Sequence, residues 1–251
     1  MTEGRARCDP RPEAREKMRI ALAAAAGLGL FFRLADLTEE PVGWQTANVL
    51  YSTGGGPLDE ILEVVRVTKG QCEARAAASV FFQGYAARLL SPQLACIATN
   101  GCLPRMPADR LRWRRPDGEM IQLGLTPGGG SEGTTEGLIA QLVSDSSEEH
   151  LQPLARALRS RVRIAEQILR DNAASALVNG LLLLSGHFGP GWKDLAACAL
   201  AQPYLRGCGS LPDTGPVLVR RSCCLIYRVP PHGKCGDCAL EYRPDGSRRA
   251  S

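Results

Sequence analysis

Apolar residues in this chain recur mostly at steps of three and four, the spacing of one face of an α-helix. Residues 13–34 and 72–90 are rich in alanine and predict two such helices. The apolar face of the second helix is formed by Ala78, Phe81, Tyr85 and Leu89. A glycine-rich stretch at 53–57 precedes an apolar-periodic segment at 58–67, which predicts a loop followed by a helix.

The second half of the chain continues the helical pattern after a short interruption. Residues 110–125 contain strand-like runs on both sides of Pro116-Asp117-Gly118, which predicts a β-hairpin. Residues 126–137 are rich in glycine and threonine and predict a flexible loop. Ser146 and Glu149 have the spacing of a capping box, and apolar residues then recur to Leu169, which predicts a long helix. Residues 177–184 are apolar enough to be buried.

These patterns predict an α+β fold that is mostly α-helical, with a small antiparallel β element and a C-terminal four-cysteine cluster module. The chain has 251 residues, enough for one large domain plus a small module. We place the larger α+β core at residues 1–205 and the C-terminal module at 206–251. Apolar residues make up 44% of the chain and charged residues 22%, which is typical of a folded protein.

The net charge of +4 is unevenly distributed. Residues 206–251 hold eight of the 30 basic residues and four of the 26 acidic ones, so the first 205 residues carry equal numbers of each. A locally basic surface favours an anionic partner or ligand. For Arg248 and Arg249, a solvated tail is the simpler interpretation.

Residues 20–32 form an apolar stretch preceded by three basic residues, as in a signal peptide. The stretch is too short to span a bilayer, which takes about 20 residues, and no A-x-A cleavage pattern follows it. We therefore favour a buried helix over a signal peptide, and we expect a cytoplasmic protein without stable membrane insertion.

Neither glycine triplet has the lysine of a P-loop, and no strand leads into G-x-G-x-x-G. The sequence therefore contains no nucleotide-binding motif, and we expect another protein to deliver any electrons. The three histidines form no H-E-x-x-H motif. We expect no nucleic-acid partner.

Four of the ten cysteines are packed into 16 residues with the pattern C-C-x10-C-x2-C. They are Cys223, Cys224, Cys235 and Cys238. Residues 225–229 between them read as a strand, and residues 230–233 as a turn. Four thiolates suit a tetrahedral zinc or a [2Fe–2S] cluster equally well in number. Neighbouring side chains on a strand point to opposite faces, so the vicinal pair requires a bend and argues mildly against a plain zinc ribbon. Spacing alone leaves zinc, iron–sulfur and structural or redox thiols open.

The phrase R-R-x-C-C-L-x-Y-R-V-P…C-G-D-C at residues 220–238 resembles the C-terminus of the FhuF-like ferric siderophore reductases. The resemblance includes the vicinal pair, the ten-residue gap and the C-G-D-C knuckle. It extends more weakly to ASVFFQGYAARLLSP at 78–92, LPRMPADRLRWR at 103–114 and NAASAL at 172–177. The first 35 residues and the loop at 126–137 carry little of it.

The resemblance implies that Cys223, Cys224, Cys235 and Cys238 hold a [2Fe–2S] cluster. It further implies a cytoplasmic enzyme that reduces Fe(III) in an imported siderophore, commonly a hydroxamate, with electrons from a ferredoxin-like donor. No acid–base catalyst is needed beyond the cluster. We expect Cys235 and Cys238 to share an iron, because the x2 spacing suits chelation.

Four basic residues bracket the cysteines: Arg220, Arg221, Arg228 and Lys234. They are candidates for contact with the donor or the siderophore, or for offsetting the negative charge of the cluster. Two other hypotheses remain: a structural zinc-binding protein, and a siderophore-binding relative that lacks the reductase. The complete cysteine set argues against the latter.

Overall fold

The computed structural model describes residues 12–38, 42–116 and 121–249, and its fold is α+β and mainly helical. The helices are α1 (Pro12–Gly27), α2 (Pro57–Thr68), α3 (Ala74–Asn100), α4 (Thr135–Ser146), α5 (Gln152–Arg159), α6 (Glu166–Leu183), α7 (Ser185–Phe188) and α8 (Trp192–Ala201). The strands are β1 (Ala35–Asp36), β2 (Gln45–Thr46), β3 (Cys102–Pro104), β4 (Leu111–Arg114), β5 (Gln122–Leu125), β6 (Gly130–Glu132), β7 (Gly209–Ser210) and β8 (Val219–Arg220). The predicted fold class is confirmed.

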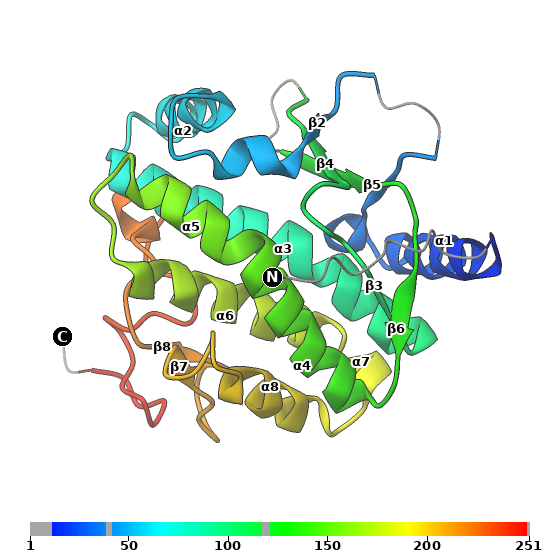
Figure 1. Cartoon of the computed structure of the whole chain (residues 1–251). Helices are drawn as coiled ribbons and strands as arrows, with labels where there is room; N and C mark the ends of the chain where they lie inside the picture. The colour runs from blue at the N-terminus through cyan, green and yellow to red at the C-terminus, as the bar shows by residue number, and fades with distance from the viewer. Residues whose placement is uncertain (1–11, 39–41, 117–120, 250–251) are drawn as a thin grey trace, which may run out of the picture.

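Helix α3 runs through the middle of the molecule, and α6 lies alongside it (Figure 1). Phe81, Phe82 and Tyr85 of α3 are fully buried, and each buried aromatic contributes about 1.5–3 kcal/mol to stability. Gly180 allows α6 to approach α3 closely, because a Cβ there would lie 2.8 Å from Leu94 Cδ1. The helix pair is therefore the frame on which the other elements are placed.

The predicted hairpin is present as β4 and β5, which pair antiparallel with Leu111 opposite Leu125. Strand β2 adds antiparallel to β4, and β1 adds parallel to β5, giving the order β1-β5-β4-β2. The predicted turn falls partly on residues 117–120, outside the described residues.

The loop expected at 126–137 contains a strand. Residues 130–132 form β6, which pairs antiparallel with β3. A Cβ on Gly130 would lie 2.6 Å from the carbonyl oxygen of Leu103, so the absence of a side chain permits this pairing. The partner strand is almost thirty residues away in the sequence. The local glycine content therefore predicted a loop and gave no sign of the strand.

The capping box predicted at Ser146 is wrong. Ser146 has helical backbone angles, and its side chain makes no capping bond. Helix α4 continues through a π-helical turn, Ser147–Leu151, into α5, and its start is capped by Thr134, which accepts from the N–H of Gly137. The predicted long helix is also interrupted between α5 and α6.

The first predicted helix is shorter than expected, because α1 ends at Gly27 and a 3-10 turn, Leu30–Phe32, follows. The second predicted helix is longer, since α3 continues through Pro92 to Asn100. Among the described residues, no helix is both long and apolar enough to cross a bilayer.

A buried chain of hydrogen bonds joins three elements of the core. His150 Nε2 lies 2.6 Å from the carbonyl oxygen of Met106, which can only accept, so Nε2 carries the ring proton. Nδ1 must then accept from Tyr51, 2.6 Å away, and the Tyr51 oxygen accepts from Tyr85 at 2.5 Å. Burial lowers the pKa of His150 to about 4, which keeps the imidazole neutral.

This lowered pKa predicts a loss of stability in mild acid. The unfolded chain binds a proton at His150 near pH 6.5, whereas the folded protein does so only near pH 4. Between these pH values the unfolded state holds more protons than the folded state. The contribution of His150 to the free energy of unfolding therefore decreases as the pH falls, by about 3 kcal/mol in total. We expect the free energy of unfolding of His150→Gln to lose this part of its pH dependence in urea titrations.

The matched control is His187→Gln, because His187 is exposed on α7. That variant should keep the wild-type pH profile between pH 4 and 6.5. A His150→Gln profile parallel to that of the wild type would contradict the assignment of a neutral, buried imidazole.

Candidate metal centre

The four clustered cysteines lie in one segment after β8, beside the first turns of α3 and α6 (Figure 1). Cys223 and Cys224 come between β8 and a 3-10 helix, Ile226–Arg228, and the other two lie in the loop that follows. The segment predicted as a strand at 225–229 is therefore a helical turn. Cys224 and Cys238 are buried, whereas Cys223 and Cys235 are half-buried.

The bend required by the vicinal cysteines is present at Leu225. This residue has a φ of 65°, in the left-handed region that costs a leucine free energy. Its N–H lies 3.3 Å from the sulfur of Cys223, to which it donates. The bend lets the chain turn directly after Cys224, so neither sulfur is held in the alternating arrangement of a strand.

Helix α3 holds the first cysteine pair through Ser79. The hydroxyl of Ser79 donates to the carbonyl oxygen of Cys224 at 2.7 Å. The side-chain amide of Asn172, on α6, donates to both the carbonyl and the hydroxyl oxygen of Ser79 at 2.9 Å. All these side chains are buried, so the backbone of the pair is fixed to both central helices.

Asp171 fixes the residue just before the pair. Its Oδ2 accepts from the N–H of Ser222 at 2.6 Å and from the Ser222 hydroxyl. Burial raises the pKa of Asp171, and the bonds from Ser222 and Gln167 oppose that effect. Asp171 and Asn172, which are neighbours on α6, therefore hold the cysteine segment at two separate points.

Arg220 connects the two halves of the cysteine motif. Its Nη1 donates to Asn172 Oδ1 at 2.8 Å, and its Nε lies 2.8 Å from Oδ2 of Asp237, between Cys235 and Cys238. The backbone N–H of Arg220 also donates to the carbonyl of Asp237 at 3.2 Å. The side chain is 0% exposed, so it is not available for the surface contact expected from the sequence.

The structure brings the sulfurs of Cys224 and Cys235 to 3.4 Å from each other. Two sulfurs on one tetrahedral metal lie about 3.8 Å apart when each metal–sulfur bond is 2.3 Å. The proton shared with Cys235 lowers the pKa of Cys224 to about 6 and raises that of Cys235. Burial raises the pKa of Cys223, against the effect of the Leu225 N–H. The separation of the Cys224 and Cys235 sulfurs suits two ligands of one metal atom, and the sharing of an iron by Cys235 and Cys238 stays a prediction.

The donor set fits a four-thiolate cofactor. Within residues 12–38, 42–116 and 121–249, no three His, Cys, Asp or Glu side chains converge as metal ligands. Two observations nonetheless suit an anionic sulfur cluster: the donors are thiols in one segment, and a buried guanidinium lies beside them.

The other three basic candidates differ in their surroundings. Arg228 donates from Nη1 to both carboxylate oxygens of Glu73, at 2.9 and 3.0 Å, and lies over the ring of Tyr227. Arg221 and Lys234 are exposed. A cleft of about 260 Å³ lies beside the motif, between the β7–β8 pair and the tail of the chain. Its lining includes two exposed basic residues, Arg221 and Arg249.

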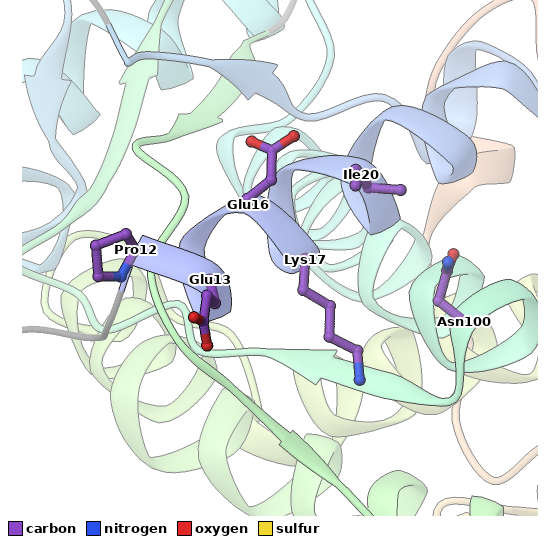
Figure 2. Close-up of a pocket in the computed structure, with 6 residues that line it drawn as sticks. All are labelled: Pro12, Glu13, Glu16, Lys17, Ile20 and Asn100. Carbon is purple, nitrogen blue, oxygen red and sulfur yellow. The ribbon is translucent and has the colours of Figure 1, made fainter.

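A larger groove of about 580 Å³ lies along α1, lined in part by Glu13, Lys17 and Asn100 (Figure 2). It is remote from the cysteines: Ser79 contacts Cys224, and Asn100 lies at the opposite end of α3, about 30 Å along the helix axis. Lys17 forms an ion pair with Glu132. Nothing in this groove adds to the metal centre.

Comparison with known proteins supports the chemistry of the cysteine segment. Residues 220–240 match the FhuF 2Fe-2S C-terminal domain. The resemblance to the FhuF-like family is thus confirmed at the motif that carried it, and the match indicates a [2Fe–2S] cluster as the cofactor. No curated protein matches the chain.

Sequence reasoning missed the side chains that hold the FhuF-type motif in place: Ser79, Asp171, Asn172 and Asp237. One signal was available in the sequence. Ser79, Asp171 and Asn172 are polar residues in helical segments rich in alanine and leucine, which are expected to be buried. A buried polar residue in such a helix usually has a specific partner.

Proposed function

We propose that this protein reduces the Fe(III) of a ferric siderophore to Fe(II) by one-electron transfer. The FhuF match at residues 220–240 is the observation that supports this most, since it points to a siderophore-associated redox protein. The cluster supplies a site that accepts and donates one electron. Hydroxamate siderophores bind Fe(III) through hard anionic oxygens, so the added electron weakens the complex and releases the metal.

The residues around the motif suit this role. Cys223 and Cys235 are half-buried, so the sulfurs lie near the surface and a docked ferric complex comes within reach of electron transfer. The neighbouring cleft, with Arg221 and Arg249 in its lining, offers positive charge to an anionic complex. Asp171 and Ser79 keep the segment fixed, so little rearrangement accompanies the change of charge.

The assay is a single turnover without oxygen. The protein is reduced with one electron per cluster, freed of reductant and mixed with a ferric hydroxamate siderophore and a chelator specific for Fe(II). We expect one Fe(II) per reduced cluster, together with return of the oxidised visible spectrum. A cluster that stays reduced in the presence of the siderophore would overturn the proposal.

We further propose a cytoplasmic location and an acidic ferredoxin-like donor that docks on Arg221 and Lys234. Replacing both residues with alanine should flatten the dependence of the rate of reduction on ionic strength, because fewer charges then steer the encounter. The measurement uses a small acidic ferredoxin as the donor, over a series of salt concentrations.

The matched control is Arg33→Ala with Lys193→Ala, which removes the same charge from two exposed positions on other elements. This control should keep the wild-type slope. An equal flattening in both double variants would assign the effect to net charge and remove the docking surface.

A further inference from the structure

Arg220 has a buried N–H group without a hydrogen-bond partner. A guanidinium carries five N–H donors and stays charged in proteins. One Nη1 donor bonds to Asn172, and Nε lies 2.8 Å from Oδ2 of Asp237 in an ion pair that lacks the geometry of a hydrogen bond. Nη2 has no hydrogen-bond partner among the described residues and is shielded from solvent.

An unpaired, charged N–H in the interior is unfavourable, so such a group usually faces an acceptor that the protein chain does not supply. Arg220 is connected to both cysteine pairs of the motif. It is three residues before Cys223, and Asp237, its ion-pair partner, stands between Cys235 and Cys238. Sulfur atoms of a cluster bound by these cysteines are acceptors of suitable chemistry in the segment next to Arg220.

We propose that Nη2 of Arg220 donates an N–H···S hydrogen bond to the bound [2Fe–2S] cluster and favours its reduced form. Asn172 and Asp237 are the positioning residues, because Asn172 accepts a hydrogen bond from Nη1 and Asp237 forms an ion pair at Nε, which leaves Nη2 with neither kind of partner among the described residues. The inference rests on the cluster that the family match indicates, and it does not depend on the siderophore.

The direction of the effect follows from charge. A four-thiolate [2Fe–2S] centre carries two negative charges when oxidised and three when reduced. A fixed positive charge and an N–H donor both stabilise the more negative form, and hydrogen bonds to the sulfurs are a recognised determinant of potential. Burial strengthens the interaction, since little solvent screens it.

The test is the midpoint potential of the cluster, measured by spectroelectrochemical titration of the holoprotein without substrate. At a fixed solution potential, Arg220→Met should lower the ratio of reduced to oxidised cluster at least tenfold, which is a shift of about 59 mV for one electron. Arg220→Lys keeps the charge but loses the planar fork, and should lower the ratio at least threefold.

Arg221→Met is the control, because it removes the same charge from the exposed neighbouring residue. It should change the ratio less than threefold. An Arg220→Met ratio within threefold of the wild type, or an equal change in Arg221→Met, would overturn the proposal.

A second measurement needs no substitution at Arg220, which matters if that variant does not assemble the cluster. Protein grown with ¹⁵N-guanidino arginine is reduced, and pulsed EPR detects nitrogen nuclei coupled to the cluster. We expect a ¹⁵N coupling that persists in Arg221→Met and Arg228→Met. Its absence from the labelled wild type would contradict the hydrogen bond, whether or not the protein reduces siderophores.

Discussion

Replacing Cys235 with serine is expected to leave the purified protein without its cluster. Cys235 lies 3.4 Å from Cys224, so the change removes one member of the pair that the structure brings together. An alcohol is a far poorer iron ligand than a thiolate, because it does not ionise near neutral pH. Iron analysis and the visible spectrum should show a fall from two irons per chain to about none.

Cys198→Ser is the matched control, since Cys198 is a half-buried cysteine on α8, outside the clustered motif. It should retain full iron and an unchanged spectrum. A Cys235→Ser protein with full iron loading would refute the ligand assignment, and a loss of iron in both variants would attribute the effect to general instability.

Asn172→Ala is expected to destabilise the folded protein strongly. The amide makes two bonds to Ser79 and accepts one from Arg220, all in the interior. Truncation leaves a buried guanidinium without its acceptor, and breaking such a network costs about 3–5 kcal/mol. Urea unfolding of the cluster-free protein measures this cost separately from cofactor binding.

Asn179→Ala provides the comparison, because Asn179 lies on the same helix and makes a single bond to the Ser175 hydroxyl at 3.3 Å. Its cost should stay below about 1 kcal/mol. If the two asparagine variants were equally stable, the network that joins α3, α6 and the cysteine segment would not be what holds the segment in place.

The parts of the fold that the sequence could predict are those with local signals. The helix at 58–67 and the hairpin at 110–125 were recognisable because each has its own periodicity and breakers. The break between α5 and α6 was not, since apolar residues keep helical spacing across it. The β3–β6 pairing depends on a contact far along the chain, to which residues 130–132 give no local clue.

The site divides in the same way. The cysteine spacing predicted a four-thiolate centre and a bend at the vicinal pair. The structure contains a bend directly after the pair, at Leu225. The burial of Arg220 was beyond sequence reasoning, because an arginine beside a metal motif is normally exposed. Its burial depends on Asn172 and Asp237, which only the folded chain brings to it.

The most direct test of the central claim is metal and sulfide analysis of protein purified without oxygen, combined with EPR of the reduced state. We expect two irons and two sulfides per chain, a coloured oxidised protein and a rhombic signal after one-electron reduction. One zinc per chain, with no chromophore and no signal, would make the four cysteines a structural site and contradict the redox function proposed for it.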